Sequence, residues 1–413
     1  MRAALVAVEG GPHSAATGLG ERAMFQGDAA EQGLGTTAAL MPMASVAADH
    51  AQPASALVAS LGPGPFAAVF LFVSPLADAG RLARQMQAAY PETPVTGCTT
   101  AGELSQDGYA EGQIVAVALP ARHFAALTLL IPDLADLPRD DLIGRVIRGR
   151  ETIGGGHAGW ENEFAFLMVD GLSIREDALT SALSAGLGPV PLFGGSAGDG
   201  TRFRETFILH RGEVLRNAAV LTLVRTACRA RVFSLDHLLP TERRMVVTEA
   251  DPLNRIVRQI NAEPAAVEYA RLLGKDPAQL TTFTFAAHPV VVRVGGKHHV
   301  RAIREAQPNG DLVFFSAIDE GLVLTLAEPQ DMVTHLEARL AALAENGPPA
   351  AILACDCILR RMEATEKQKS TAISALLRRH RVVGFSTYGE QLNAMHVNQT
   401  MTGVAIYPPE EGG

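Results

Sequence analysis

The feature of the sequence that most restricts its fold is a pattern that occurs three times. In each copy, an apolar run is followed by a helical stretch and then by a short strand that ends in a turn of glycine, hydroxyl, glycine and acid. The apolar runs span residues 67–74, 163–171 and 350–358, and the turns span residues 97–103, 194–199 and 384–390. Because all three matches share the same preceding strand and helix, we interpret the pattern as a repeated supersecondary unit.

The three turns align residue by residue and form a candidate ligand pocket. The aligned triplets are Thr100, Ser196 and Thr387, then Gly102, Gly198 and Gly389, and then Glu103, Asp199 and Glu390. Glycine allows close backbone approach, and exposed amides and hydroxyls can hold a carboxylate or phosphate. Glycine is also used simply to turn the chain between strands, and the pattern leaves both roles open. Cys98 in the first turn and His396 after the third are further pocket candidates.

The pattern predicts a mixed α/β (α+β) fold with two lobes of strand-helix-strand units that end in glycine-rich turns. Residues 1–44 lack a sustained period and are predicted to form a poorly ordered tail. The lobes are predicted to span residues 45–240 and 241–413. Between the second and third copies, the sequence predicts a hairpin around Gly295 and Gly296 and a helix from Pro264 to Gly274.

Composition restricts the class of protein. A net charge of -9 argues against nucleic acid or an anionic membrane surface as the main partner. Four cysteines in 413 residues are too few for a disulfide framework, and no export signal is recognised, so we expect a cytoplasmic protein. The uncharged stretch 53–77 is interrupted by Gly62-Pro63-Gly64-Pro65, which predicts a helix followed by a buried strand in place of a membrane span.

Several segments together resemble the FIST domain in its N-terminal and C-terminal halves, from about residue 45 to 407. They are FVSP, GCTTAGE, FGGSAGDG, HPVVVRVGG, AIDEGLVL, VVGFSTYGEQ and HVNQT. The resemblance implies a bacterial intracellular sensory domain for small ligands. Such domains work beside a separate partner such as a histidine kinase or a cyclic-dinucleotide enzyme.

Residues 237–251 and 355–361 look most similar to the NosP branch of that family. This resemblance implies b-type haem, nitric oxide sensing and His237 as the iron ligand. Leu238 departs from the aromatic residue that the branch commonly carries after the histidine. Taken alone, the apolar neighbours of His237 suit a haem pocket and also an ordinary core histidine.

The sequence contains no GxGxxG after a strand, no P-loop and no HExxH. We therefore expect a sensor that is not an enzyme and that signals through protein contacts. The alternatives are a haem-free pocket for a small metabolite such as an amino acid, and an enzyme that uses carboxylates between the lobes. A homodimer is also compatible with the sequence.

Overall fold

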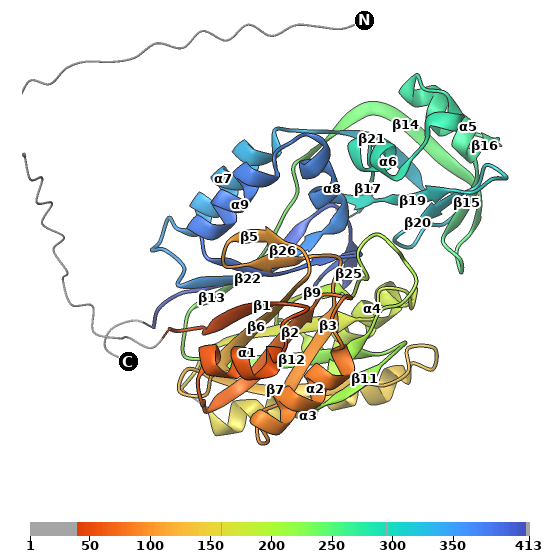
Figure 1. Cartoon of the computed structure of the whole chain (residues 1–413). Helices are drawn as coiled ribbons and strands as arrows, with labels where there is room; N and C mark the ends of the chain where they lie inside the picture. Colours follow the sequence, from red (N-terminus) through yellow and green to blue (C-terminus); the bar gives the residue numbers. More distant parts are fainter. Residues whose placement is uncertain (1–38, 158, 295, 410–413) are drawn as a thin grey trace, which may run out of the picture. The chain divides into compact units, whose positions relative to one another are not determined.

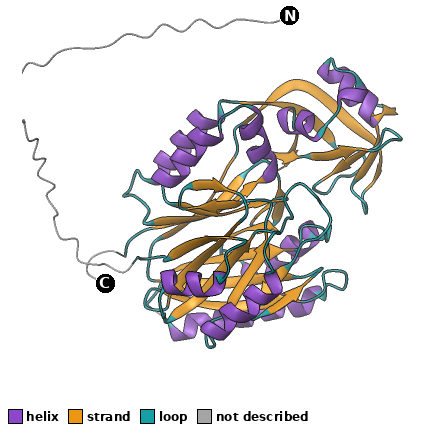
Figure 2. Ribbon diagram, viewed as in Figure 1, coloured by secondary structure: helices purple, strands orange, loops and turns teal. Residues whose placement is uncertain are grey.

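The computed structural model describes residues 39–157, 159–294 and 296–409, which belong to one compact unit (Figure 1). Most of the predicted tail lies outside the described residues. Met43 and Ala44, which the prediction placed in the tail, belong to strand β1 (Met43–Ala47). The mixed α/β class is confirmed, with helices on the outer faces of stacked sheets (Figure 2).

Each copy of the repeat forms a strand-helix-strand unit whose two strands are parallel. The first copy contains β2 (Phe66–Val73), α2 (Ala79–Ala89) and β3 (Val95–Thr99). The second contains β8 (Asn162–Val169), α4 (Glu176–Leu187) and β9 (Leu192–Ser196). The third contains β22 (Ala351–Cys357), α8 (Ile358–Glu366), α9 (Ser370–Arg379) and β23 (Val382–Thr387). The three predicted units are therefore confirmed.

Two further strands extend each unit on its other side. An antiparallel strand lies beside the first strand of each copy, namely β6 (Gln113–Pro120), β12 (Ala219–Thr226) and β26 (Met401–Ile406). The outer strands are β1, β7 (Phe124–Ile131) and β13 (Ala230–Leu235). The copies are thus equivalent over four strands.

A hairpin from a different copy completes each of these three sheets. The hairpin of the second copy, β10 (Ile208–His210) and β11 (Glu213–Leu215), pairs with β3. The hairpin of the third, β24 (Glu390–Leu392) and β25 (Met395–Val397), pairs with β9. The hairpin of the first, β4 (Glu103–Ser105) and β5 (Gly108–Ala110), pairs with β23. The exchange is cyclic, so the third copy joins the first two in one body, although the prediction assigned it to the second lobe.

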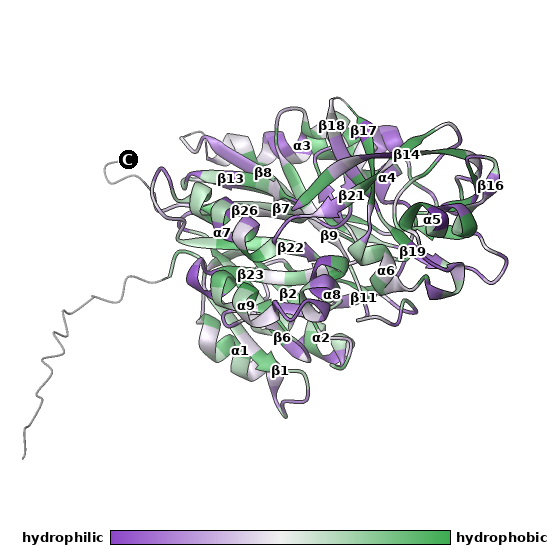
Figure 3. Ribbon diagram, turned by 90° about the horizontal axis from the view of Figure 1, so that it is seen from above, coloured by the Kyte–Doolittle hydropathy of each residue, from purple (hydrophilic) through white to green (hydrophobic). Residues whose placement is uncertain are grey.

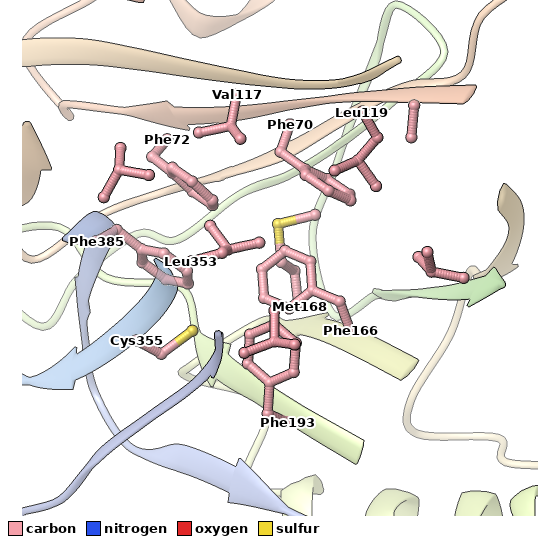
Figure 4. Packing of buried hydrophobic residues seen from close by; sticks show 14 of the residues in the cluster. Phe70, Phe72, Val117, Leu119, Phe166, Met168, Phe193, Leu353, Cys355 and Phe385 are labelled. Carbon is pink, nitrogen blue, oxygen red and sulfur yellow. The ribbon is translucent and has the colours of Figure 1, made fainter. Parts of the chain in front are cut away.

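The centre of this body is a packed aromatic core. Phe72 stacks on Phe385 with ring centroids 4.7 Å apart, and Phe166 stacks on Phe193 at 4.8 Å (Figure 4). Interior strands such as β22 carry mainly hydrophobic residues (Figure 3). Outside the sheets lie helices α1 (Pro53–Leu61), α3 (Arg139–Gly156) and α7 (Met332–Leu343). In the described part of the chain, no helix is both long and apolar enough to span a membrane.

The chain between β13 and α7 forms a separate sheet with its own hydrophobic cluster, and we call residues 238–329 the cap. Its strands are β14 (Leu238–Asp251), β15 (Ile256–Ile260), β16 (Glu263–Pro264), β17 (Val290–Val294), β18 (Lys297–Arg301), β19 (Ile303–Ala306), β20 (Leu312–Phe314) and β21 (Val323–Pro329). Its helices include α5 (Ala265–Leu273) and α6 (Thr282–Ala287). Strands β17 and β18 form the predicted hairpin, and Pro264 and Gly274 flank α5 as predicted.

Candidate functional site

The three glycine turns meet in a ring of equivalent backbone hydrogen bonds. Ala101 N–H donates to the Ser386 carbonyl over 2.9 Å, and Gly198 N–H donates to the Thr99 carbonyl over 3.0 Å. In the third contact, Tyr388 N–H donates to the Ser196 carbonyl over 3.2 Å. These bonds hold the copies together, so the turns have a clear structural role.

The first and third turns also match in their side chains. Thr100 donates to Glu103 over 2.5 Å, and Thr387 donates to Glu390 over 2.5 Å. Each carboxylate also accepts an N–H from the start of the next strand, at Gln113 and at Thr400 respectively. Burial raises the pKa of Glu390 to about 8. The predicted alignment of these two turns is therefore correct.

The second turn is shifted by one residue from the predicted alignment. The ring of hydrogen bonds makes Ser196 equivalent to Thr99 and Ser386, and not to Thr100 and Thr387. The physical reason is a longer loop before β10, which places Ile208 where the other hairpins begin with Glu103 and Glu390.

Asp199 consequently has a different role from those two acids. Its carboxylate accepts the N–H groups of Phe203, Arg204 and Glu205, which fixes this loop, and it also bonds the hydroxyl of Tyr388. Asp199 therefore orders a loop and ties it to the third turn, whereas Glu103 and Glu390 close hairpins.

The three junctions between neighbouring copies differ in what fills them. Between the first and second copies, a cavity of about 480 Å³ opens beside Asp78, Asp199 and the exposed Arg202. Between the third and first copies, the buried Arg361 guanidinium packs against Gly102, where an added Cβ would lie 2.3 Å from its Nη1. Arg361 also donates to the carbonyl oxygens of Glu103 and Ala110.

The junction between the second and third copies lies under the cap and contains buried side chains that are only partly hydrogen-bonded. The following atoms have no hydrogen-bond partner among the described residues: Asn398 Nδ2 and Oδ1, Gln391 Oε1, Gln399 Oε1, Ser316 Oγ and Arg301 Nε. Asn398, Gln391, Gln399 and Ser316 are each fully buried. We call these five residues, together with His396, the polar cluster.

Contacts around His396 locate the polar cluster between the body and the cap. His396 Nδ1 lies 3.3 Å from Gln391 Nε2, and Arg301 of β18 approaches the His396 carbonyl oxygen at 3.5 Å. Gly389 leaves room for this arrangement, since an added Cβ would lie 2.3 Å from His396 and 2.7 Å from Asn398. Burial lowers the pKa of His396, which favours a neutral ring.

A buried ion pair joins the cap to the second copy beside the polar cluster. Arg255 donates to Glu176 over 2.7 Å and to Asp177 over 3.1 Å, both in the first turn of α4. Arg255 also donates to the Phe315 carbonyl, next to Ser316. Arg301 has no carboxylate within 4.0 Å among the described residues, and burial lowers its pKa. The region therefore holds two acids and two arginines.

His237 lies elsewhere, at the connection between β13 and the cap. Its ring is fully buried, with Nδ1 2.8 Å from Arg360 Nη1 and Nε2 2.9 Å from Glu363 Oε2. A guanidinium can only donate, so Nδ1 accepts and Nε2 carries the proton that Glu363 accepts. Burial lowers the pKa of His237, and hydrogen bonding to His237 and Lys367 lowers that of Glu363 against the effect of burial.

Comparison with protein families supplies the deciding observation. A family model for the FIST N domain matches residues 67–263, and one for the FIST C domain matches residues 265–393. The chain belongs to the FIST family. Membership indicates a sensory domain of signal transduction. A search of curated proteins found no match.

The resemblance to the NosP branch of the FIST family implied haem held by His237, and the surroundings of this residue do not fit that role. Iron coordination needs a ring nitrogen with a free lone pair and open space before it. The Nδ1 lone pair accepts from Arg360, and the protonated Nε2 faces Glu363. Both ring nitrogens of His237 are therefore already engaged by protein groups.

The cysteine predicted as a pocket residue lies in the core. Cys98 is fully buried among aliphatic and aromatic side chains, and burial raises its pKa well above the usual range for a thiol. The thiolate, which is the form that binds metals, is therefore disfavoured at this position.

Of the predicted pocket residues, His396 belongs to the polar cluster, Gly389 lies against it, and Ser196 accepts a hydrogen bond from Gln391. Thr387 and Glu390 close the adjoining hairpin. The other two junctions contain the remaining predicted residues of the turns, namely Thr100, Gly102, Gly198 and Asp199. The prediction missed Arg301, Ser316 and Asn398. The uncharged polar run Asn398-Gln399-Thr400 in an otherwise apolar strand region was the available signal.

Proposed function

We propose that this FIST protein is a sensor of a small polar metabolite that binds at the polar cluster beneath the cap. The observation that carries the proposal is the set of buried polar atoms without partners. Each such atom costs about 1–3 kcal/mol when it is left unpaired, and folded proteins keep few of them. Their concentration between two parts of one FIST protein suits a ligand that supplies the missing hydrogen bonds.

Charge balance narrows the chemistry of this ligand. Glu176 and Asp177 balance Arg255 and Arg301, so a ligand with net charge would leave a buried charge uncompensated. Arg301 offers guanidinium donors to a carboxylate, and the amide oxygens of Asn398 and Gln391 can accept from an ammonium or hydroxyl group. A zwitterion such as an amino acid, or a neutral polar metabolite, meets these requirements.

The cap provides a route from binding to signalling. A ligand that bonds both Arg301 of the cap and Asn398 of the body favours the closed arrangement by its differential affinity for it. The output then passes to a separate protein, such as a histidine kinase or a cyclic-dinucleotide enzyme.

The experiment is a screen of amino acids and other small polar metabolites by thermal shift, followed by calorimetry on each hit. We expect Arg301→Met to weaken binding by about tenfold or more, because it removes a charge-assisted hydrogen bond. Arg202→Met, which changes an exposed arginine at the open junction, is the matched control and should leave binding unchanged. Equal losses in both variants, or no binder, would reject the site. If no binder is found, ordered water is the hydrogen-bond partner of the polar cluster atoms.

The haem hypothesis is tested in the same preparation. The purified protein is titrated with haem, and ferrous spectra are recorded with and without nitric oxide. A saturable Soret band that shifts with the gas would replace the metabolite proposal by a haem sensor. Weak, unsaturable binding would leave the metabolite proposal in place.

A further inference from the structure

His237 stands where both connections between the cap and the body meet. The chain enters the cap directly after it, at Leu238, and leaves the cap at Pro329, which pairs with Leu238. On the exit side, Gln330 N–H donates to the His237 carbonyl over 2.7 Å. The backbone of His237 is thus fixed to the outgoing connection. This backbone contact leaves the side chain available for hydrogen bonds with other residues.

That side chain sits in the middle of a continuous chain of buried polar contacts. Tyr109 of β5 donates to Asp356 over 2.5 Å, and Arg360 donates to the same carboxylate over 2.8 Å. Arg360 then bonds His237 Nδ1, and His237 Nε2 bonds Glu363. Lys367 completes the series, donating to Glu363 over 2.6 Å. The contacts connect the first copy, the third copy and the cap connections.

We propose that His237 fixes both cap connections to helix α8, and we call it the hinge pin of the cap. It does so as a neutral imidazole of fixed tautomer and is not an iron ligand. The position requires one acceptor toward Arg360 and one donor toward Glu363. A neutral imidazole supplies both at once, whereas an iron-bound ring would give up one of them. The inference does not depend on a metabolite binding at the polar cluster.

Helix α8 then links the position of the cap to the first copy. Arg360 reaches back to the pin, and the next residue, Arg361, fills the junction beside Gly102. Helix α6 of the cap also packs against α8. A movement of the cap connections therefore acts on the helix that joins the third copy to the first.

The test compares two substitutions of His237. Glutamine keeps an acceptor and a donor at similar spacing but lacks an imidazole nitrogen for iron, and leucine lacks both polar atoms. Hydrogen exchange is measured by mass spectrometry over residues 236–246, 323–331 and 356–367. We expect His237→Gln to exchange like the wild type and His237→Leu to exchange about tenfold faster or more in these segments.

Two results would overturn the proposal. One is wild-type exchange in both variants, since the pin would then hold nothing. The other is a wild-type Soret band, saturable with haem, that is lost in His237→Gln while exchange stays unchanged, because the imidazole would then be serving iron. A Soret band that persists in His237→Gln places any haem elsewhere and agrees with the pin.

A second measurement covers the case in which His237→Leu does not fold. Nitrogen-15 NMR of histidine-labelled wild type distinguishes the two neutral tautomers and the charged ring, and His237→Gln assigns the signal by its disappearance. We expect the neutral form with the proton on Nε2 at pH 7. A proton on Nδ1, or a charged ring, would contradict the pin.

Discussion

The open junction between the first and second copies and the covered junction between the second and third are built from equivalent elements. Each places the end of one parallel strand and the following helix against the turn of the next copy. At the open junction the arginines Arg202 and Arg204 are exposed to solvent. At the covered junction Asn398 of the body and Ser316 of the cap are both fully buried. The comparison shows that the cap, and not the repeated turn, makes one junction a binding-site candidate.

The largest effect is expected from Arg255→Met, which removes the ion pair between the cap and α4. Glu176 would remain buried without its cation, so we expect the free energy of unfolding to fall by about 3–5 kcal/mol. Urea denaturation measures it. If the free energy of unfolding falls only as much as it does when an exposed ion pair is lost, Arg255 does not join the cap to the second copy in this way.

The next effect concerns Glu390, the acid that begins the hairpin at the covered junction, where the open junction has Ile208. Burial raises the pKa of Glu390 to about 8, so the folded state holds this proton more tightly than the unfolded state does. Stability from this group is present below the ordinary glutamate pKa and is lost as the pH rises toward 8. We expect a decrease of up to about 1.4 kcal/mol per pH unit between pH 5 and 8.

Glu390→Gln should remove this contribution to the slope, and urea denaturation at several pH values measures it. Ile208 occupies the equivalent position at the open junction, so no such dependence is expected from that side. An unchanged slope in Glu390→Gln would mean that the carboxyl is ionised throughout this range.

A smaller effect of opposite sign is expected from Asn398→Leu. Replacing a buried amide that lacks partners by an apolar side chain of similar size should raise the free energy of unfolding of the ligand-free protein by about 1 kcal/mol. Binding of the metabolite should be lost in the same variant. A destabilised variant would indicate that ordered water already satisfies Asn398.

The smallest effect is expected from Arg204→Met at the open junction. An exposed arginine contributes little, so we expect a change within about 0.5 kcal/mol and no change in ligand binding. Thermal unfolding and calorimetry measure both. A large loss of stability would show that this junction is as tightly organised as the covered one.

Much of the secondary structure could be predicted because local sequence patterns determine it. The buried strands, the helix between Pro264 and Gly274 and the turn glycines all follow from periodicity and chain-breaking residues. The alignment of the second turn failed by one residue because the loop before Ile208 is longer. The exchange of hairpins could not be predicted, since strand pairing between distant segments leaves no local signal.

The candidate site was harder to predict than the fold. Arg301, Ser316 and Asn398 come from separate parts of the chain, and only the folded cap brings them near one another. His237 was found from a resemblance, but its role depends on Arg360 and Glu363. These two lie more than 120 residues away in sequence, so a motif around His237 cannot reveal that both ring nitrogens are engaged.

The cyclic exchange of hairpins has a consequence for folding during synthesis on the ribosome. The hairpin β4–β5 is synthesised well before its partner β23, which follows it along the chain after most of the other described strands. Until then the hairpin is an unpaired edge, open to association with other nascent chains. The ring closes only after β23 has been made, so the protein should depend on chaperones more than a chain whose strands pair in order.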